Sequence, residues 1–545
     1  MNIDTIKIFN PSSTKIQIRS VKPVAIKLSI ILLSLGMILA MSSCGFREIK
    51  FKSSESATGG VLKMHIYPPL TLDPVNDLSV YESFLLNQVH SGLVELDEGL
   101  RPIPGMAEFW TIDSTFTRFT FQLRPHITFQ NGKPLEMPDV YQSFLYLIQR
   151  DAQQTTAVHH FIDEILGIDQ WLAGEIQELP GITIIDSSHI QFTLKRSTPD
   201  FLYFFAADQA KIILREKPDA LPVGAGPFMI KNITDTLITL SLFQQYFQRT
   251  AYLDSILLYL DDTSTGDKEF DYLLNGKVNF IECPLWGVDT LSTISRFQTQ
   301  KRLSLEFDFI GLRVDRPPLN DINFRRLLFQ RINWSRISKP DNPYFVRANG
   351  VIPPGMDGYR PDLVHPLFKP ENQRDPELNL PEKFDRSLIY GVVDTVYVDT
   401  EDDFIIQDWM DLGVPLKWPP FSWSSFDHAL TRGEMDFFVM GWLVEIPSTP
   451  RYLYNLFHSN GVGNYFGYHN PNVDALIQAA LHTDDKRQQI LLCQAIEDSI
   501  LTDMPVIPSS FVFTAYAYDA RFRNVNLSEM GLPTLRCEDI WIEKN

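Results

Sequence analysis

The sequence predicts a globular protein of the mixed α/β class, in which strands and helices alternate along a chain of 545 residues. Thr117 to Arg124 alternates apolar and polar side chains, which is the period of a half-buried strand. An apolar stripe of helical spacing ends at Gly413, which suits a helix C-cap, and Val414 to Trp418 is typical of a strand. Asp436 to Trp442 is a nearly continuous apolar run, as expected of a strand covered on both faces.

Further elements follow from local patterns. Val61, Met64 and Ile66 predict a first strand, which Tyr67-Pro68-Pro69 ends. His126 to Phe129 extends the strand at 117–124, and Asn131-Gly132 supplies the two positive φ angles of a tight hairpin turn. A helix with Pro138 in its first turn follows. Its inward stripe consists of Val140, Phe144, Leu147 and Ile148.

The two remaining helical predictions concern the second half of the chain. The stripe before Gly413 consists of Phe404, Ile405, Trp409 and Leu412. Near the C-terminus, Thr483 is the predicted cap of a helix that stops before Pro505. The side chains of that helix that are predicted to face inward are Leu492, Ile496, Ser499 and Ile500.

The N-terminus carries an export signal. Leu28 to Cys44 is an uncharged apolar run that is too short to span a bilayer, and five basic residues precede it. Ser42-Ser43-Cys44 resembles a bacterial lipobox, in which the cysteine carries the lipid. We therefore expect a signal peptide over 1–43, lipidation at Cys44 and a flexible tether over 44–58. The alternative is a buried helix with an incidental cysteine.

Composition narrows the function further. The formal net charge of −19 disfavours nucleic acid and anionic membrane surfaces as partners. Besides Cys44, only Cys283, Cys493 and Cys537 are present, without metal-ligand spacing, so no disulfide framework or metal site is predicted. The chain has none of the HExxH, GxSxG, GxxxxGK[ST] or CxxC motifs. We therefore expect no enzyme and no cofactor.

A series of short motifs resembles the family 5 extracellular solute-binding proteins, which are peptide- and nickel-binding receptors of ABC importers. The longest stretch that carries this resemblance is Pro104 to Phe144. The others occur in the family's order: Gly59-Gly60, Leu72-Asp73-Pro74, Ser91-Gly92-Leu93, Val223 to Phe228, Asn275 to Asn279, Pro318 to Asp321 with Phe324-Arg325-Arg326, Gly441-Trp442, Asn464-Tyr465, Asn470-Pro471 with Asp474, and Pro505 to Pro508. Ala225 and Asn279 depart from the family's usual threonine and aspartate.

The resemblance implies a two-lobed, periplasmic-binding-protein-like α/β clamp in which helices pack on mixed sheets. Lobe I would comprise 59–97, 210–303 and 499–545, with 98–209 as an extra subdomain, and lobe II would comprise 304–498. It further implies a monomer in the periplasm, lipid-anchored to a bacterial membrane, that delivers short peptides to an ABC permease and its ATPase.

The resemblance also assigns binding residues. An aspartate shortly after Gly-Trp grips the peptide's α-ammonium in family members, and Glu445 occupies that place after Gly441-Trp442. A carboxylate suits this role because a desolvated ammonium needs a charge-assisted partner. Trp442 would form a wall of the cleft. The alternatives are a solvated loop acid for Glu445 and a core position for Trp442.

Two further segments are candidates. Leu78-Ser79-Val80 matches the place where family members run main chain alongside the ligand, although it is also compatible with a surface turn. His159 or His160 would reach the cleft, but adjacent residues point in different directions, so a surface histidine pair is the alternative. Ligand class stays open between short peptides and nickel chelate, haem, sugar or opine-like conjugates. A sensor without transport and an envelope hydrolase are the rival functions.

Overall fold

The computed structural model describes residues 58–544 apart from 68–69, 77, 154–155, 218–219, 261–265, 338–343, 370–374, 376 and 394–399. The predicted signal peptide, the lipidation site at Cys44 and most of the predicted tether lie outside the described residues. Ser56–Asn545 forms one compact unit. The elements below all belong to this unit.

The first sheet has four strands in the order β1-β10-β9-β8. These are β1 (Val61–Ile66), β10 (Ser255–Leu260), β9 (Leu237–Leu242) and β8 (Phe228–Thr234). β1 pairs parallel with β10, and the other pairs are antiparallel. Helix α2 (Val80–Val89) contributes Phe84 and Leu85 to the same core, where both are fully buried. The predicted first strand is confirmed.

The second sheet is antiparallel and carries helix α3 (Met137–Asp151). Its strands are β4 (Ala107–Ile112), β5 (Arg118–Leu123), β7 (His189–Thr193) and β6 (Ile182–Ile184), in that order. The predicted stripe of α3 is confirmed, because its four side chains are at most 1% exposed. Phe144 meets Phe192 of β7 edge to face, with ring centroids 4.8 Å apart.

The turn before α3 differs from the prediction. Gly132 has a φ of +84°, but Asn131 does not have a positive φ. Instead the Asn131 side chain accepts a hydrogen bond from the Lys133 N–H at 3.0 Å, as in an Asx-turn. Residues 126–129 form no strand beyond one bridge between Thr128 and Pro134, so the extension of β5 was wrong.

Short elements join these two sheets. They are β2 (Val94–Leu96), β3 (Pro102–Pro104), α4 (His159–Ile162), α5 (Ile168–Leu172), α6 (Leu202–Ala206) and the 3₁₀ turn η1 (Asp208–Ala210). β2 pairs with β3, and α6 packs on both of these strands. Together they place the α2 C-terminus beside α6 and η1, where a cavity lies.

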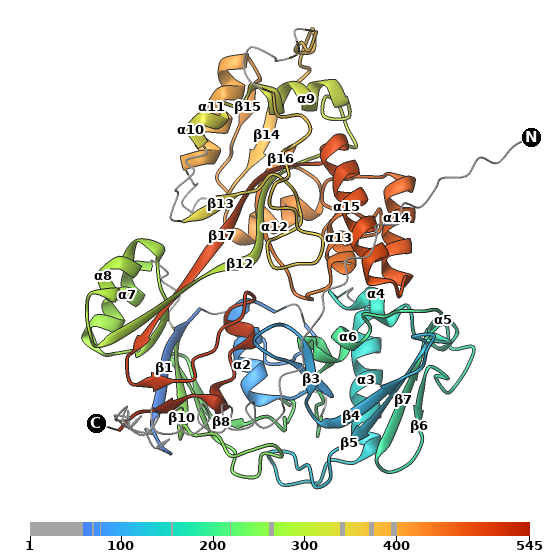
Figure 1. The fold of residues 1–545 in the computed structure, drawn as a ribbon, viewed down its shortest axis with the longest axis vertical. Helices are drawn as coiled ribbons and strands as arrows, with labels where there is room; N and C mark the ends of the chain where they lie inside the picture. Colours follow the sequence, from blue (N-terminus) through green and yellow to red (C-terminus); the bar gives the residue numbers. More distant parts are fainter. Residues whose placement is uncertain are drawn as a thin grey trace, which may run out of the picture. The chain divides into compact units, whose positions relative to one another are not determined.

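Two long strands organise the third sheet, whose order is β11-β17-β12-β16-β14-β15, with β13 paired to β17. β12 (Phe297–Leu312) and β17 (Val506–Asp519) run antiparallel side by side from Phe297↔Asp519 to Gly311↔Val506 (Figure 1). Their register shifts between Leu303 and Phe307. The shorter strands are β11 (Phe280–Glu282), β13 (Phe345–Arg347), β14 (Leu388–Gly391), β15 (Leu416–Lys417) and β16 (Phe437–Leu443).

Helices pack on this sheet at both ends of the long strands. α7 (Gly266–Asn275) and α8 (Val288–Ser292) contact β11 and the start of β12. At the other end lie α9 (Ile322–Arg331), α10 (Trp334–Ile337), α11 (Thr400–Leu412), α12 (Trp423–Thr431), α13 (Thr449–Phe457), α14 (Pro471–His482) and α15 (Lys486–Asp503). α13, α14 and α15 pack on one another (Figure 1).

Most of the predicted helical pattern in this region is confirmed. Gly413 follows α11 with a φ of +102°, and Trp409 of that helix is fully buried. The predicted strand at 414–418 shrinks to Leu416–Lys417. Asp485, rather than Thr483, caps α15, because its carboxylate accepts the Arg487 and Gln488 N–H groups. The pattern missed Cys493, which is 1% exposed.

Lobe I consists of the first two sheets together with α7, α8, β11 and the C-terminal segment. Lobe II consists of the elements that lie along the chain between the register shift in β12 and the part of β17 that pairs with it. The chain passes between the lobes within β12 and β17. Residue 499, at the predicted return to lobe I, lies inside α15, and α15 packs on α14 of lobe II. Residue 303, at the predicted exit, lies at the register shift.

Candidate functional site

A cavity of about 90 Å³ lies where lobe II meets lobe I. Lobe I supplies the end of α2, Glu95 of β2, the α6–η1 region with Lys211, and the segment 530–538. Lobe II supplies Glu445 and Ile446. One water molecule takes up about 10–15 Å³ of such cavity volume, so the cavity has room for several waters or for a small polar group. Both lobes therefore contribute to one cavity, whose lining includes both polar and apolar side chains.

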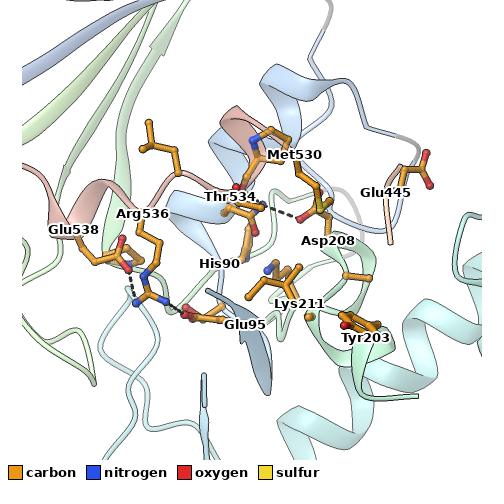
Figure 2. A pocket seen from close by; sticks show the side chains of 18 of the residues that line it. His90, Glu95, Tyr203, Asp208, Lys211, Glu445, Met530, Thr534, Arg536 and Glu538 are labelled. Carbon is orange, nitrogen blue, oxygen red and sulfur yellow. Dashed lines mark hydrogen bonds and ion pairs between the residues drawn. The ribbon is translucent and has the colours of Figure 1, made fainter. Parts of the chain in front are cut away.

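Arg536 forms ion pairs with two of the acids around this cavity. Arg536 binds Glu95 at 2.6 Å and Glu538 at 2.9 Å, as Figure 2 shows. Asp208 accepts a hydrogen bond from the Asn87 side chain at 2.8 Å. His90 is 2% exposed, and burial, together with the nearby Lys211, lowers the pKa of its imidazole to about 3. His90 is therefore neutral at physiological pH.

Lobe II reaches lobe I next to this cavity. Ile446 is 5% exposed and belongs to the same apolar cluster as the phenylalanines of the second sheet. Glu445 is exposed, and its carboxylate points away from the other side chains labelled in Figure 2. The predicted binding carboxylate therefore lies at the cavity's edge rather than inside it.

A buried ion pair joins the lobes nearby. Arg451 of α13 is 1% exposed, and its Nε and Nη2 each lie 3.1 Å from a carboxylate oxygen of Asp200 in lobe I. Ser448 donates its hydroxyl to the same carboxylate at 2.6 Å. The guanidinium also lies over the Phe161 ring, 4.2 Å from its centroid. We call Asp200 and Arg451 the inter-lobe ion pair.

The sheet face at Gly441 of β16 is acidic. A Cβ on Gly441 would lie 2.4 Å from Glu306 Oε1 and 2.7 Å from Asp308 Oδ1, so both carboxylates lie close to the Gly441 backbone. Burial raises the pKa of Glu282 in β11 to about 7, and the charges of Glu306 and Glu269 add to this. Burial also raises the pKa of Glu306. This face favours positive charge.

The other predicted binding residues have structural contacts. Trp442 is half-buried and packs against Gly463 and Leu456 of lobe II. Its predicted place in a ligand cleft stays a prediction. It is not among the residues that line the described cavity.

The segment Leu78-Ser79-Val80 begins α2. Ser79 is its N-cap, and the Ser79 N–H donates to the Glu82 carboxylate at 2.9 Å in a capping box. Leu78 and Val80 are half-buried. The Ser79 N–H is therefore already used, and a ligand would have to pair with other main-chain groups of this segment.

The two histidines have different surroundings. The Nδ1 atom of His159 lies 2.6 Å from the Asp151 carboxylate, and this hydrogen bond raises the pKa of His159. His160 is 5% exposed, and burial lowers its pKa well below the usual range. Its ring centroid lies 5.4 Å from that of Tyr454 in lobe II. A surface histidine pair is therefore wrong, because His160 is buried at the lobe boundary.

Three of these features have no recognisable pattern in the sequence. Lys211, Glu282 and the inter-lobe ion pair come together only through the tertiary fold, from segments far apart in the chain. Cys283, Cys493 and Cys537 are buried free thiols. Within the described residues, no cluster of three or more His, Cys, Asp or Glu side chains is placed to hold a metal ion. None of the helices in this part of the chain combines the length and the apolar character of a membrane span.

Comparison with known proteins identifies the family. The model of the bacterial extracellular solute-binding proteins, family 5 Middle, matches residues 101–464. This chain belongs to the family 5 solute-binding proteins. The predicted two-lobed α/β class is thereby confirmed, and the family consists of binding proteins.

The proteins to which this chain is similar bind peptides in some cases and other ligands in others. The dipeptide-binding protein of Escherichia coli K12 is 25% identical over 466 residues, which are 78% of this chain and 84% of that protein. DppA from Helicobacter pylori in complex with the peptide STSA has a TM-score of 0.74 at 19% identity, covering 90% of this chain and 99% of that one. AgaA from A. tumefaciens R10 in complex with agropinic acid has a TM-score of 0.72 at 19% identity, covering 89% and 99%.

Proposed function

We propose that this protein is the substrate-binding lipoprotein of an ABC importer and that it captures short peptides between its two lobes. The observation that carries the proposal is the approach of lobe II to lobe I at one cavity, lined by Glu445 and Ile446 from one side and by α2 and Lys211 from the other. A hinged pair of lobes that shares a cavity with a few polar groups can enclose a small ligand.

The family and the charge of the site support short peptides as the ligands. One relative of this chain is named a dipeptide-binding protein, and a structure of the same fold holds the peptide STSA. Glu445 lies exposed at the cavity edge, and a carboxylate at this place suits a ligand's α-ammonium. The acidic face around Gly441 favours the same positive charge.

The remaining parts of the proposal concern location and partners. The predicted lipid on Cys44 would hold the protein at a bacterial membrane in the periplasm, and a permease with its ATPase would receive the ligand. We propose that it works there as a monomer. We also propose the domain division expected from the sequence, with the return to lobe I in β17 instead of at residue 499.

The test uses residues 45–545, which contain the whole compact unit. We expect a library of di- to pentapeptides to raise the melting temperature, because a ligand that binds only the native state stabilises it by about 2.7 kcal/mol at a concentration 100 times Kd. Glu445→Gln should abolish the shift for peptides with a free amine and leave N-acetylated peptides unaffected.

Glu434→Gln is the matched control, because Glu434 is also an exposed acid of lobe II but lies outside the cavity. It should behave as the wild type. A wild-type protein that shifts with no peptide would contradict the peptide assignment. If Glu445→Gln loses the rise in melting temperature equally for free-amine and N-acetylated peptides, Glu445 does not bind the peptide's amine.

A further inference from the structure

A groove of about 550 Å³ lies on lobe I, where β1 meets the turn before β11, the start of β12 and the end of β17. The start of β12 and the end of β17 lie beside α8 (Figure 1). The volume of the groove falls within the range of small-molecule sites, which is roughly 300–1,000 Å³. Of the described residues, none lines both this groove and the cavity at the lobe boundary, so the two are separate places.

Asn279 joins the segments that form the groove. Its side-chain oxygen accepts the Lys63 N–H at 2.7 Å, and its side-chain amide donates to the Val61 carbonyl at 2.8 Å. Its carbonyl accepts the Asp519 N–H at 3.0 Å. Asn279 makes these contacts without a charge, at a position where aspartate is the usual residue of the family. The groove therefore has one negative charge fewer than an aspartate would give it.

The groove carries a net positive charge, although the formal net charge of the protein is −19. Its lining includes three cations, Lys63, Arg296 and Arg521, and one acid, Asp519. Arg521 binds both oxygens of the Asp519 carboxylate, at 2.8 and 3.0 Å. Within the described part of the chain, neither Lys63 nor Arg296 forms an ion pair. Two positive charges of the groove are therefore left without an acidic partner.

The fold holds both of these cations at the groove. Strand alternation directs Leu62 and Met64 of β1 into the core, where they are at most 1% exposed, and places Lys63 on the other face. The Arg296 guanidinium lies over the Phe297 ring, 4.7 Å from its centroid, and its Nη2 donates to the Leu273 carbonyl at 2.9 Å. A guanidinium has five N–H donors, so most of those of Arg296 are available to an anion.

We propose that this groove binds a phosphate group. Phosphate presents several charged oxygens to cations that arrive from different segments, whereas a carboxylate presents two, and arginine and lysine are the usual phosphate ligands among side chains. The phosphate belongs to an anionic phospholipid or is a soluble ion. The net charge of the whole protein repels both, so the attraction is confined to the groove.

The place of the groove favours the lipid. The chain enters lobe I at Gly59, whose N–H donates to the Tyr252 carbonyl at 2.7 Å, four residues before Lys63. Cys44 precedes Gly59 by 15 residues, which span at most about 50 Å when fully extended. A lipid on Cys44 would therefore keep the groove within reach of the headgroups. The lipid source rests on the proposed anchor, whereas the phosphate site does not.

The test uses residues 45–545, which lack the anchor, so that binding to vesicles reports on the groove alone. Flotation compares vesicles of phosphatidylcholine with vesicles of equal parts phosphatidylcholine and phosphatidylglycerol, and calorimetry uses sodium phosphate. We expect the wild type to bind only the vesicles that contain phosphatidylglycerol. Lys63→Gln/Arg296→Gln should weaken this binding about 25-fold, because each basic residue near an anionic surface contributes about five-fold.

Controls separate the groove from the overall charge. Lys231→Gln/Arg118→Gln removes the same two charges from exposed positions of lobe I outside the groove and should bind as the wild type does. Asn279→Asp adds a carboxylate to the groove and should weaken binding in the same direction as the double variant. It provides a second measurement if the double variant does not fold.

Each outcome decides between the sources or against the site. Binding of sodium phosphate without flotation, lost in Lys63→Gln/Arg296→Gln, would assign the groove to soluble phosphate. A wild type that binds neither the vesicles nor sodium phosphate, or that binds them no better than the double variant, would overturn the proposal. Peptide binding should be the same in the double variant and the wild type, so a wild type that floats but binds no peptide would reject the proposed function alone.

Discussion

The inter-lobe ion pair gives the sharpest prediction about closure. Asp200→Asn removes the charge that Arg451 needs but keeps the shape of the side chain. Arg451 is 1% exposed, and both of its contacts to Asp200 are 3.1 Å long. Breaking a buried pair from one side costs about 3–5 kcal/mol, because the remaining charge stays buried.

This cost falls on the state in which the lobes are in contact. A closed state weakened by about 3 kcal/mol lowers the affinity for an enclosed ligand about 100-fold, since each 1.4 kcal/mol is a factor of ten. We therefore expect calorimetry with the best peptide of the library to give a Kd about two orders of magnitude higher for Asp200→Asn. The double variant Asp200→Asn/Arg451→Met should regain part of this loss, since no uncompensated charge remains.

Glu497→Gln is the matched control within one lobe. Glu497 lies on α15, is 1% exposed and accepts two hydrogen bonds from Arg360 of the same lobe, at 2.8 and 3.1 Å. It should lower the melting temperature while leaving Kd unchanged. If Asp200→Asn likewise lowers only the melting temperature, the Asp200–Arg451 pair does not report on closure and the reasoning is refuted.

Three further predictions follow from local structure. The pKa of Glu282 is about 7 in the folded protein, compared with its ordinary value of 4.5. Between these two pH values the folded protein binds more protons than the unfolded chain. The free energy of unfolding therefore falls by on the order of 3 kcal/mol as the pH rises through this window. Urea unfolding at pH 5 and 7.5 should show this fall in the wild type and a flatter profile in Glu282→Gln; an equal fall in both would contradict it. Gly224→Ala should cost about 1–3 kcal/mol in urea unfolding, because its Cβ would lie 2.0 Å from the Val89 carbonyl; an unchanged midpoint would contradict this. Cys44→Ala should move the full-length protein from the membrane fraction to the soluble fraction, and unchanged fractionation would reject lipidation.

The sequence motifs that predicted the fold contain residues that form hydrogen bonds and helix caps within it. Asp73 of Leu72-Asp73-Pro74 accepts hydrogen bonds from Arg215 and Tyr146, both at 2.7 Å. Asp321 and Asn470 are the N-caps of α9 and α14. Residues of this kind are determined by local geometry, and a sequence pattern therefore reveals them.

The site could not be predicted in the same way. Lys211 and Glu282 take their surroundings from segments that the fold brings together, so no spacing along the chain marks them. Arg451 meets Asp200 across 251 positions. The boundary expected at residue 499 falls inside α15, which continues to Asp503 and packs on α14. Tertiary packing of this kind leaves no local pattern in the sequence.

Native mass spectrometry tests the central claim, that two lobes enclose one short peptide, most directly. Residues 45–545 are purified without refolding and mixed with an equimolar set of di- to pentapeptides. We expect a complex of one protein with one peptide, and a weaker complex in Asp200→Asn. Ions of the ligand-free protein alone, from a sample that melts cooperatively, would contradict it.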